Sequence, residues 1–113
     1  MPRYFNIEQL EKETDESFAR ELVGMFIETT PSAIDILKIA AQKNDMHQIE
    51  QIMHKIKPSL RILHVQDLDK EAEYMEGLAR NQGAIDNERL AHFVHILESC
   101  IDEMRIFLND INR

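Results

Sequence analysis

Apolar residues recur every three or four positions along nearly the whole chain, and no stretch alternates between apolar and polar residues as a strand does. The pattern therefore predicts an all-α protein. Its clearest stripe follows Asp45, a suitable N-cap, and consists of Ile49, Ile52, Ile56, Leu60 and Leu63. A second regular seam follows Asp86 at alternating spacings of four and three residues, and its members are Leu90, Val94, Leu97, Ile101, Met104, Leu108 and Ile111.

Capping and helix-breaking residues predict the limits of the other helices. Asn6 is expected to cap a short helix that ends near Thr14, and Asp15 is expected to cap a second one. Thr30-Pro31 predicts the start of a third helix, because Thr is a good N-cap and proline fits the first helical position. The third helix should end near Lys43-Asn44, and a later one should run from about Asp67 to Gly83.

The predicted inner faces of these helices and their short connections indicate the architecture. The second helix should bury Phe18, Leu22, Met25 and Phe26, the third Ala33, Ile34, Leu37 and Ala41, and the helix after Asp67 should bury Leu68, Ala72, Met75 and Ala79. Short connections favour antiparallel neighbours. We expect one domain over residues 1–113, an up-down-up-down four-helix bundle over about residues 31–112 with the short N-terminal helices packed across it. The outer faces carry no second continuous apolar stripe, so we expect a monomer.

Composition and charge narrow the class of protein. The formal net charge is −8, from 21 acidic and 13 basic residues, which disfavours nucleic acid as a partner. No apolar run approaches the roughly 20 residues of a membrane span, and Met1 to Ile7 do not resemble a signal peptide. Cys100 is the only cysteine, so no internal disulfide can form. A single cysteine fits a reducing compartment, and we expect a cytoplasmic protein without membrane contacts.

Several kinds of chemistry lack the residues that they need. No glycine-rich phosphate loop is present, so ATP has no visible site. No metal is expected, because His47 and His54 lie two helical turns apart, His92 and His95 are predicted on an outer face, and no Glu-x-x-His occurs. Cys100 is predicted near the apolar seam, where a thiol is usually inert packing. The serines at positions 59 and 99 have no nucleophile-elbow context.

His54 is the one conspicuous chemical group. At 100° per residue it lies about 150° from the centre of the apolar stripe, so it should point to solvent. Lys57 is one turn away, where its ammonium can reach the space above the imidazole, and Lys55 and Arg61 add positive charge nearby. These residues predict a basic patch around an exposed nucleophile on an acidic chain. An exposed histidine beside lysines can also be an ordinary surface residue.

The segment His54-Lys55-Ile56-Lys57-Pro58 resembles the histidine-containing phosphotransfer domain of multistep phosphorelays, whose signature is a helical His followed three residues later by Lys and then usually by Gly. The resemblance extends upstream to Phe26-Ile27 and Thr30-Pro31, and downstream from Met75-Glu76 to Ala79-Arg80. Two positions depart from it, because Pro58 and His64 stand where the family has glycines.

This resemblance implies that His54 accepts a phosphoryl group from a receiver-domain aspartyl phosphate and passes it to another receiver. Lys57 would offset charge on the phosphoryl oxygens, with Lys55 and Arg61 as further candidates for phosphoryl binding. The chain itself would need no cofactor, because the receiver would supply Mg²⁺. The implied partners are response-regulator receiver domains and a hybrid sensor kinase, and the chain would be a carrier rather than an ATP-dependent kinase.

Docking residues and alternative functions complete the expectations. Met46 and Met53 flank the His54 face and are candidates for an apolar docking rim or for the edge of the core, and Pro58, on the solvent face near His54, is a further docking candidate. One alternative is a helical adaptor that binds a receiver while His54 stays idle. Another is a pair of dimerisation helices from an autophosphorylating kinase, which would require a dimer.

Overall fold

The computed structural model describes residues 4–81 and 83–111, with side chains as far as Asn109. These residues form five helices, which are α1 (Ile7–Glu13), α2 (Glu16–Lys43), α3 (Met46–Ile62), α4 (Leu68–Arg80) and α5 (Asn87–Ile111). No strand forms within the described ranges, and one isolated bridge joins Phe5 to Val65. The predicted all-α class is confirmed.

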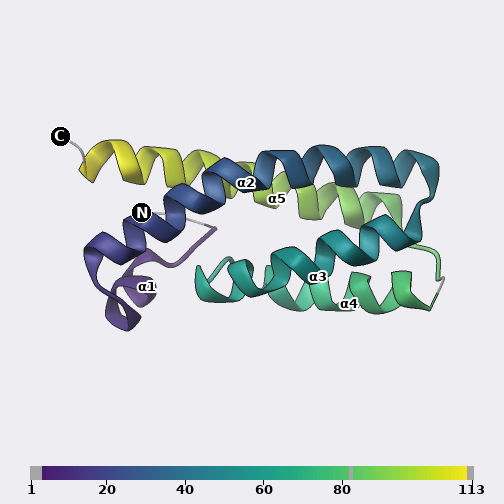
Figure 1. Cartoon of the computed structure of the whole chain (residues 1–113), viewed down its shortest axis with the longest axis horizontal. Helices are drawn as coiled ribbons and strands as arrows, with labels where there is room; N and C mark the ends of the chain where they lie inside the picture. Colours follow the sequence, from purple (N-terminus) through teal and green to yellow (C-terminus); the bar gives the residue numbers. More distant parts are fainter. Residues whose placement is uncertain (1–3, 82, 112–113) are drawn as a thin grey trace.

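The long helices form an elongated bundle that measures 46 × 22 × 20 Å (Figure 1). Helix α2 packs on both α3 and α5, and α3 packs on α4. Figure 1 shows α2 and α3 in the nearer layer and α4 and α5 behind them, with α1 at the end that holds the N-terminus. The helical bundle is confirmed, and its up-down-up-down order stays a prediction. Residues 1–3, 82 and 112–113 lie outside the described part. The predicted domain limits at residues 1 and 113 and the predicted end of the bundle near residue 112 therefore fall outside it.

Three of the predicted helix starts are confirmed by their caps. The side chains of Asn6, Asp15 and Asp45 accept hydrogen bonds from the backbone amides of Gln9, Phe18 and Gln48, at 3.0, 2.7 and 3.1 Å. Such bonds satisfy amides that have no partner inside the helix. At the other predicted limits, α4 begins at Leu68 after Asp67 and ends at Arg80, before Gly83.

The helix start predicted at Thr30-Pro31 is wrong. Helix α2 runs unbroken through Pro31, and Thr30 is buried rather than placed at a cap. An interior proline removes one helical hydrogen bond and costs about 3 kcal/mol. One continuous helix nevertheless buries Val23 and Phe26 before the proline and Ile34 and Leu37 after it, and this burial outweighs that cost.

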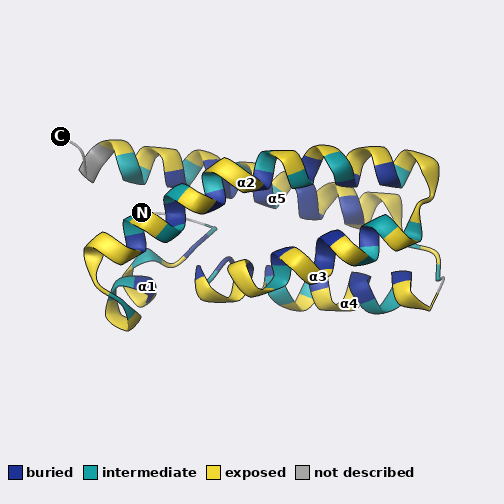
Figure 2. Cartoon of the chain, viewed as in Figure 1, coloured by how far each residue is buried: buried dark blue, intermediate teal, exposed yellow. Residues whose placement is uncertain are grey.

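The inner faces of α3, α4 and most of α5 match the predicted stripes (Figure 2). In the second half of α2, Ile34 and Leu37 are buried as predicted and Ala33 and Ala41 are half-buried, whereas the first half of α2 does not match its predicted face. Phe18 and Met25 are 47% and 59% exposed, and the buried residues around them are Ala19, Val23 and Phe26. Apolar residues occupy two adjacent faces of this segment, and the face that carries Ala19, Val23 and Phe26 turns inward. On α5 the seam is buried as far as Met104, Leu108 is half-buried, and the Ile111 side chain lies outside the described residues.

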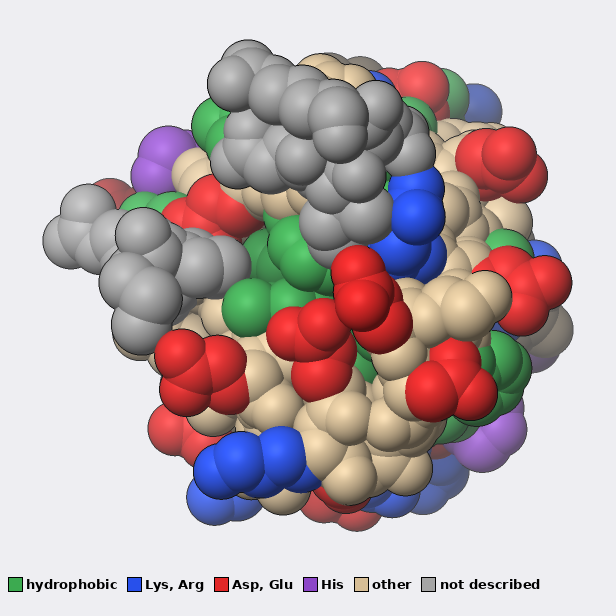
Figure 3. Space-filling model, turned by 90° about the vertical axis from the view of Figure 1, so that its left-hand side faces the viewer, with side chains coloured by type: hydrophobic (Ala, Val, Ile, Leu, Met, Phe, Trp, Pro, Cys, Tyr) green, Lys and Arg blue, Asp and Glu red, His purple; other side chains and the backbone are tan. Residues whose placement is uncertain are grey.

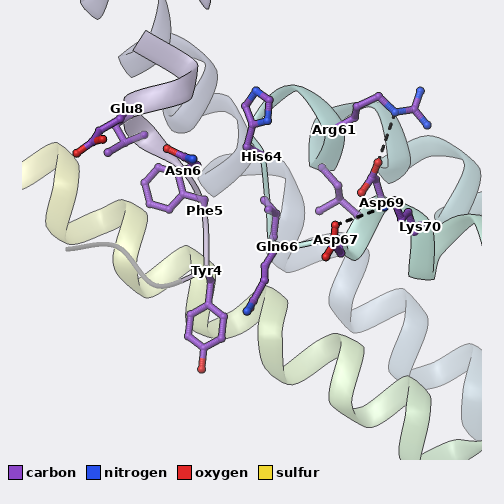
Figure 4. A pocket seen from close by; sticks show the side chains of 13 residues that line it. Tyr4, Phe5, Asn6, Glu8, Arg61, His64, Gln66, Asp67, Asp69 and Lys70 are labelled. Carbon is purple, nitrogen blue, oxygen red and sulfur yellow. Dashed lines mark ion pairs between the residues drawn. The ribbon is translucent and has the colours of Figure 1, made fainter. Parts of the chain in front are cut away.

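The N-terminal segment closes the end of the bundle where α3 turns into α4 (Figure 4). The Asn6 amide donates to the His64 carbonyl at 3.2 Å, and the edge of the Phe5 ring meets Phe107 with ring centroids 6.1 Å apart. A hollow beside this contact is lined by both apolar and polar side chains, and the latter include the pair Arg61–Asp69. Acidic side chains are spread over this end of the molecule (Figure 3).

Candidate functional site

His54 lies near the middle of α3 and points away from the core, as predicted. Its side chain is 74% exposed, whereas Ile52, Met53 and Ile56 beside it are buried. The regular stripe of α3 causes this arrangement, because burial of the isoleucines fixes the rotation of the helix about its axis. The imidazole is therefore held at the surface on a rigid element.

A buried carboxylate from the neighbouring helix holds the imidazole. Glu76 of α4 is 4% exposed at its side chain, and His54 Nδ1 lies 2.8 Å from its Oε2. An ionised carboxylate can only accept hydrogen bonds, so Nδ1 carries the hydrogen. In the neutral ring, the lone pair then lies on Nε2, the nitrogen on the far side of the ring from Glu76.

Lys57 binds the other oxygen of the same carboxylate. Its Nζ lies 3.0 Å from Glu76 Oε1 and 4.0 Å from Glu73 Oε1, and its side chain is only 18% exposed. Lys57, the predicted neighbour of His54, is thus part of the site, and its ammonium group contacts Glu76. The two family-signature residues are joined through an acidic residue that the signature does not contain.

Arg80 completes the cluster from one turn further along α4. Its Nη2 lies 2.7 Å from Glu76 Oε2, and its Nε lies 3.0 Å from Glu50 Oε2 on α3. The hydrogen bond to Glu50 and the charge of Glu76 raise the pKa of the guanidinium further. The site therefore contains one buried carboxylate with three partners, His54, Lys57 and Arg80.

Burial and pairing act in opposite directions on Glu76. Burial by itself would raise the pKa of the carboxyl, but hydrogen bonds from Lys57 and His54 outweigh it, and the pKa lies below its usual value. Glu76 is accordingly ionised near neutral pH. Every buried side-chain oxygen or nitrogen in the described residues has a hydrogen-bond partner, and this carboxylate is no exception.

The sequence prediction assigned no chemical role to Glu76 or Arg80, although a signal for Glu76 was present. Glu76 lies between Ala72 and Ala79 on the predicted inner stripe of α4, where an acidic residue is unexpected. A carboxylate on a buried stripe requires cationic or hydrogen-bonding partners. The pattern of α4 thus marks Glu76 as unusual, whereas the identity of its partners depends on how α3 and α4 pack against each other.

Two other predicted cations lie apart from this cluster. Lys55 is exposed and lines a groove between α2 and α3, together with Thr29 and Ser59. Arg61 is exposed and pairs with Asp69 at 3.6 Å. In residues 4–81 and 83–111, neither cation is hydrogen-bonded or ion-paired to His54 or Glu76. Of the four residues that the sequence predicted for phosphoryl binding, the structure therefore brings together only His54 and Lys57.

The predicted docking residues separate into core and surface. Met53 is fully buried, so its place in an exposed docking rim is wrong. It belongs to the core because it lies next to Ile52 on the inner side of α3. Met46 is half-buried at the start of α3, and Pro58 is exposed one turn after His54. These two remain accessible to a partner.

The second departure from the family signature has a clear backbone context. His64 has a φ of 54°, in the left-handed region that favours glycine. Its ring pairs with Glu13, near the end of α1. The side chain that replaces glycine thus joins the α3–α4 turn to the N-terminal helix, away from Glu76.

Other candidate groups are placed as follows. His47 contacts Gln51 at 3.0 Å, and His92 and His95 are exposed on α5. Burial raises the pKa of the Cys100 thiol to about 12, which agrees with an inert packing role. Among the described residues, no three His, Cys, Asp or Glu side chains are grouped so that they could hold a metal ion. None of the described helices is long and apolar enough to cross a membrane.

Comparison with known proteins gives one match. A protein-family model described as Hpt domain matches residues 21–111 of this 113-residue chain. The matched segment includes His54, Lys57, Glu76 and Arg80. Neither the curated proteins nor the solved structures yielded a match.

Proposed function

The chain belongs to the Hpt domain family, and from this premise we propose that His54 carries a phosphoryl group between two receiver domains. The Hpt family acts in histidine phosphotransfer within phosphorelays and interacts with receiver domains of response regulators. The observation that supports His54 as the carrier is its pairing with Glu76. An exposed imidazole, held at Nδ1 by a buried carboxylate, presents Nε2 to an incoming protein.

The transfer step follows from this geometry. The lone pair of Nε2 attacks the phosphorus of the receiver's aspartyl phosphate, an N–P bond forms, and the P–O bond to the aspartate breaks, which leaves the receiver with a free carboxylate. Nδ1 keeps its hydrogen. Positive charge develops on the ring as the N–P bond forms, and the Glu76 carboxylate, 2.8 Å from Nδ1, offsets it.

Lys57 has two roles in this proposal. In the resting site its Nζ holds Glu76 Oε1 at 3.0 Å and so keeps the carboxylate aligned. Its side chain belongs to the same helix as His54, one turn away, so the ammonium can also offset charge on the phosphoryl oxygens. The receiver supplies Mg²⁺ and the acidic pocket, and this chain binds no cofactor of its own.

The proposed setting is a cytoplasmic phosphorelay with a hybrid sensor kinase among the partners. Met46 and Pro58 are the accessible candidates for contact with the receiver. We expect the chain to be a monomer, because the predicted seams of α3, α4 and most of α5 are buried within the bundle. Light scattering should give the mass of one chain over a hundredfold range of concentration, and a constant dimer mass would favour the alternative of kinase dimerisation helices.

The test of the proposal is transfer of label from a phosphorylated receiver. Wild type should gain an acid-labile, alkali-stable phosphoryl group, as expected of a phosphoramidate, and His54→Gln should gain none. Helical content and melting temperature should change little in this variant, because the His54 side chain is mostly exposed.

Substitution of the other four histidines provides matched controls. His47→Gln, His64→Gln, His92→Gln and His95→Gln should all be labelled at the wild-type rate. If His54→Gln is labelled as fast as wild type, the carrier role is wrong. If the receiver binds wild type and never labels it, the chain acts as an adaptor.

A further inference from the structure

The Glu76 carboxylate creates a conflict for a nucleophilic histidine. Its hydrogen bond to Nδ1 is useful because it keeps the lone pair on Nε2. A carboxylate beside an imidazole also favours the doubly protonated ring, as it does in serine-protease triads. An imidazolium has no lone pair and cannot attack phosphorus. A working site must therefore keep the hydrogen bond and limit the negative charge that the ring experiences.

Two cations contact the Glu76 carboxylate and partly neutralise its negative charge. Lys57 binds Oε1, while Arg80 binds Oε2, the same oxygen that His54 contacts. The guanidinium and the imidazole thus lie within two hydrogen-bond lengths of each other across a single oxygen atom. Arg80 is held in this position from its other side by Glu50, at 3.0 Å.

The charged groups that ion pairs connect to this site lie on α3 and α4. On α4, the helix packed against His54, they are Glu73, Glu76 and Arg80, and on α3 they are Glu50 and Lys57. Glu73 is 67% exposed and lies 4.0 Å from Lys57, so water screens it more than it screens the buried Glu76. Among these groups Arg80 is the only cation that contacts the oxygen facing His54.

We propose that Arg80 is a positioning residue. Its guanidinium partly neutralises the negative charge on Glu76 Oε2 and so keeps the His54 ring neutral, with the lone pair of Nε2 free to attack. The inference rests on the proposed carrier function of His54. It assigns a residue outside the His-x-x-Lys signature to the control of the nucleophile. The reactivity of His54 then depends on a balance between one buried carboxylate and two cations.

The direct test is the titration of His54 in the folded protein, followed by NMR of the ring protons. The spectrum of His54→Gln identifies the His54 signal among the five histidines. In Arg80→Gln the titration midpoint of His54 should move to higher pH by about half a unit or more, because Glu76 loses its nearest counter-charge. Arg80→Lys keeps the charge and should restore most of the wild-type midpoint.

The rate of phosphoryl acceptance should show the same effect as a pH dependence. At pH 7 Arg80→Gln should accept label about 1.5-fold to threefold more slowly than wild type, because a shift of half a unit leaves more of its His54 protonated. Above about pH 8.5 its rate should equal or exceed that of wild type, since the less neutralised carboxylate stabilises positive charge on the ring better. A role in folding or docking would slow the variant equally at every pH.

Matched controls separate this effect from general changes of charge. Arg105→Gln removes an arginine of similar exposure that pairs with Asp102 on α5, and it should leave the His54 midpoint unchanged. In Glu76→Gln, addition of Arg80→Gln should produce no further shift, because the carboxylate is already absent. Circular dichroism should show that each variant is folded.

The outcomes distinguish this inference from the proposed function. An unchanged midpoint in Arg80→Gln, or a rate loss that is constant with pH, would overturn the role of Arg80. The NMR titration requires no receiver, so it decides the role of Arg80 even if wild type accepts no label. Failure of wild type to accept label from a bound receiver would overturn the carrier function alone.

Discussion

Two histidines of this chain each pair with a glutamate from another element, and the pairs differ in which partner is buried. His54 is 74% exposed and its Glu76 is 4% exposed, whereas His64 is 32% exposed and its Glu13 is 50% exposed. In the first pair the acid is fixed and the ring faces the solvent. In the second pair the acid is the more exposed partner, on the short helix α1.

The difference shows how burial decides the use of the same two residue types. Glu76 has lost most contact with water, so its charge acts strongly on whatever touches it, and two cations are needed to hold it. Glu13 is half exposed, so water screens its pairing with His64. The first pair is suited to the control of a reactive group, and the second to a weak tie between α1 and the α3–α4 turn.

The largest expected contrast between the pairs is in stability. Glu76→Ala leaves Lys57 without its main partner and opens a gap between α3 and α4, so it should lower the free energy of unfolding by about 3 kcal/mol. Glu13→Ala should cost less than about 1 kcal/mol. Urea unfolding of both variants measures the difference, and equal losses would show that the contrast in burial has no energetic consequence.

Acid should reduce the advantage that Glu76 gives. Pairing lowers the pKa of Glu76 in the folded protein, so its contribution to stability is complete above the usual carboxyl range and is lost as the pH falls through the folded value. The stability difference between wild type and Glu76→Gln should therefore shrink below about pH 4. Thermal melts from pH 7 to pH 3 test this, and a difference that grows on acidification would contradict it.

The next contrast concerns the cation that only the His54 pair has. Lys57→Ala should slow phosphoryl acceptance about tenfold without abolishing it, because a positioned charge assists the transfer and forms no bond. Lys55→Ala on the same helix is the matched control, since Lys55 is exposed and lies on the groove toward α2. Rapid-quench labelling gives both rates, and equal slowing would indicate that only the net charge of α3 matters.

The smallest expected effect is at His64. His64→Gly relieves the left-handed backbone at φ 54° but removes the pair with Glu13, so the stability should change by less than about 1 kcal/mol. Phosphoryl acceptance should stay at the wild-type rate. A large loss of transfer in this variant would mean that the two histidines are coupled through the α3–α4 turn.

Much of this architecture was predictable from local patterns, and the errors have physical causes. The stripe from Ile49 to Leu63 placed His54 correctly, because one regular apolar face fixes the rotation of a helix. Helix α2 was harder to predict. Tertiary packing, which local sequence patterns do not reveal, keeps the helix continuous through the start signal at Thr30-Pro31. Phe18 and Met25 misled for a related reason, because two adjacent faces of α2 carry apolar residues and only the tertiary contacts choose between them.

The site was predictable only in the part that lies on a single helix. His54 and Lys57 are neighbours on α3, so helical geometry alone associates them. Glu76 and Arg80 come from α4, and their contacts depend on how far α4 is rotated and shifted relative to α3. Spacing along the sequence carries no direct information about that placement. The burial of Met53 was ambiguous in the sequence, because its position is at the border of the predicted apolar face of α3. In the structure it is buried in the core.

The turn of residues 63–67 between α3 and α4 has a consequence for protein engineering. All five members of the charged cluster, Glu50, His54, Lys57, Glu76 and Arg80, lie on the two helices that this turn joins. The α3–α4 hairpin is therefore the shortest continuous segment that holds the complete arrangement. A graft of α3 alone onto another scaffold would carry the signature motif and lose the carboxylate that orients its histidine.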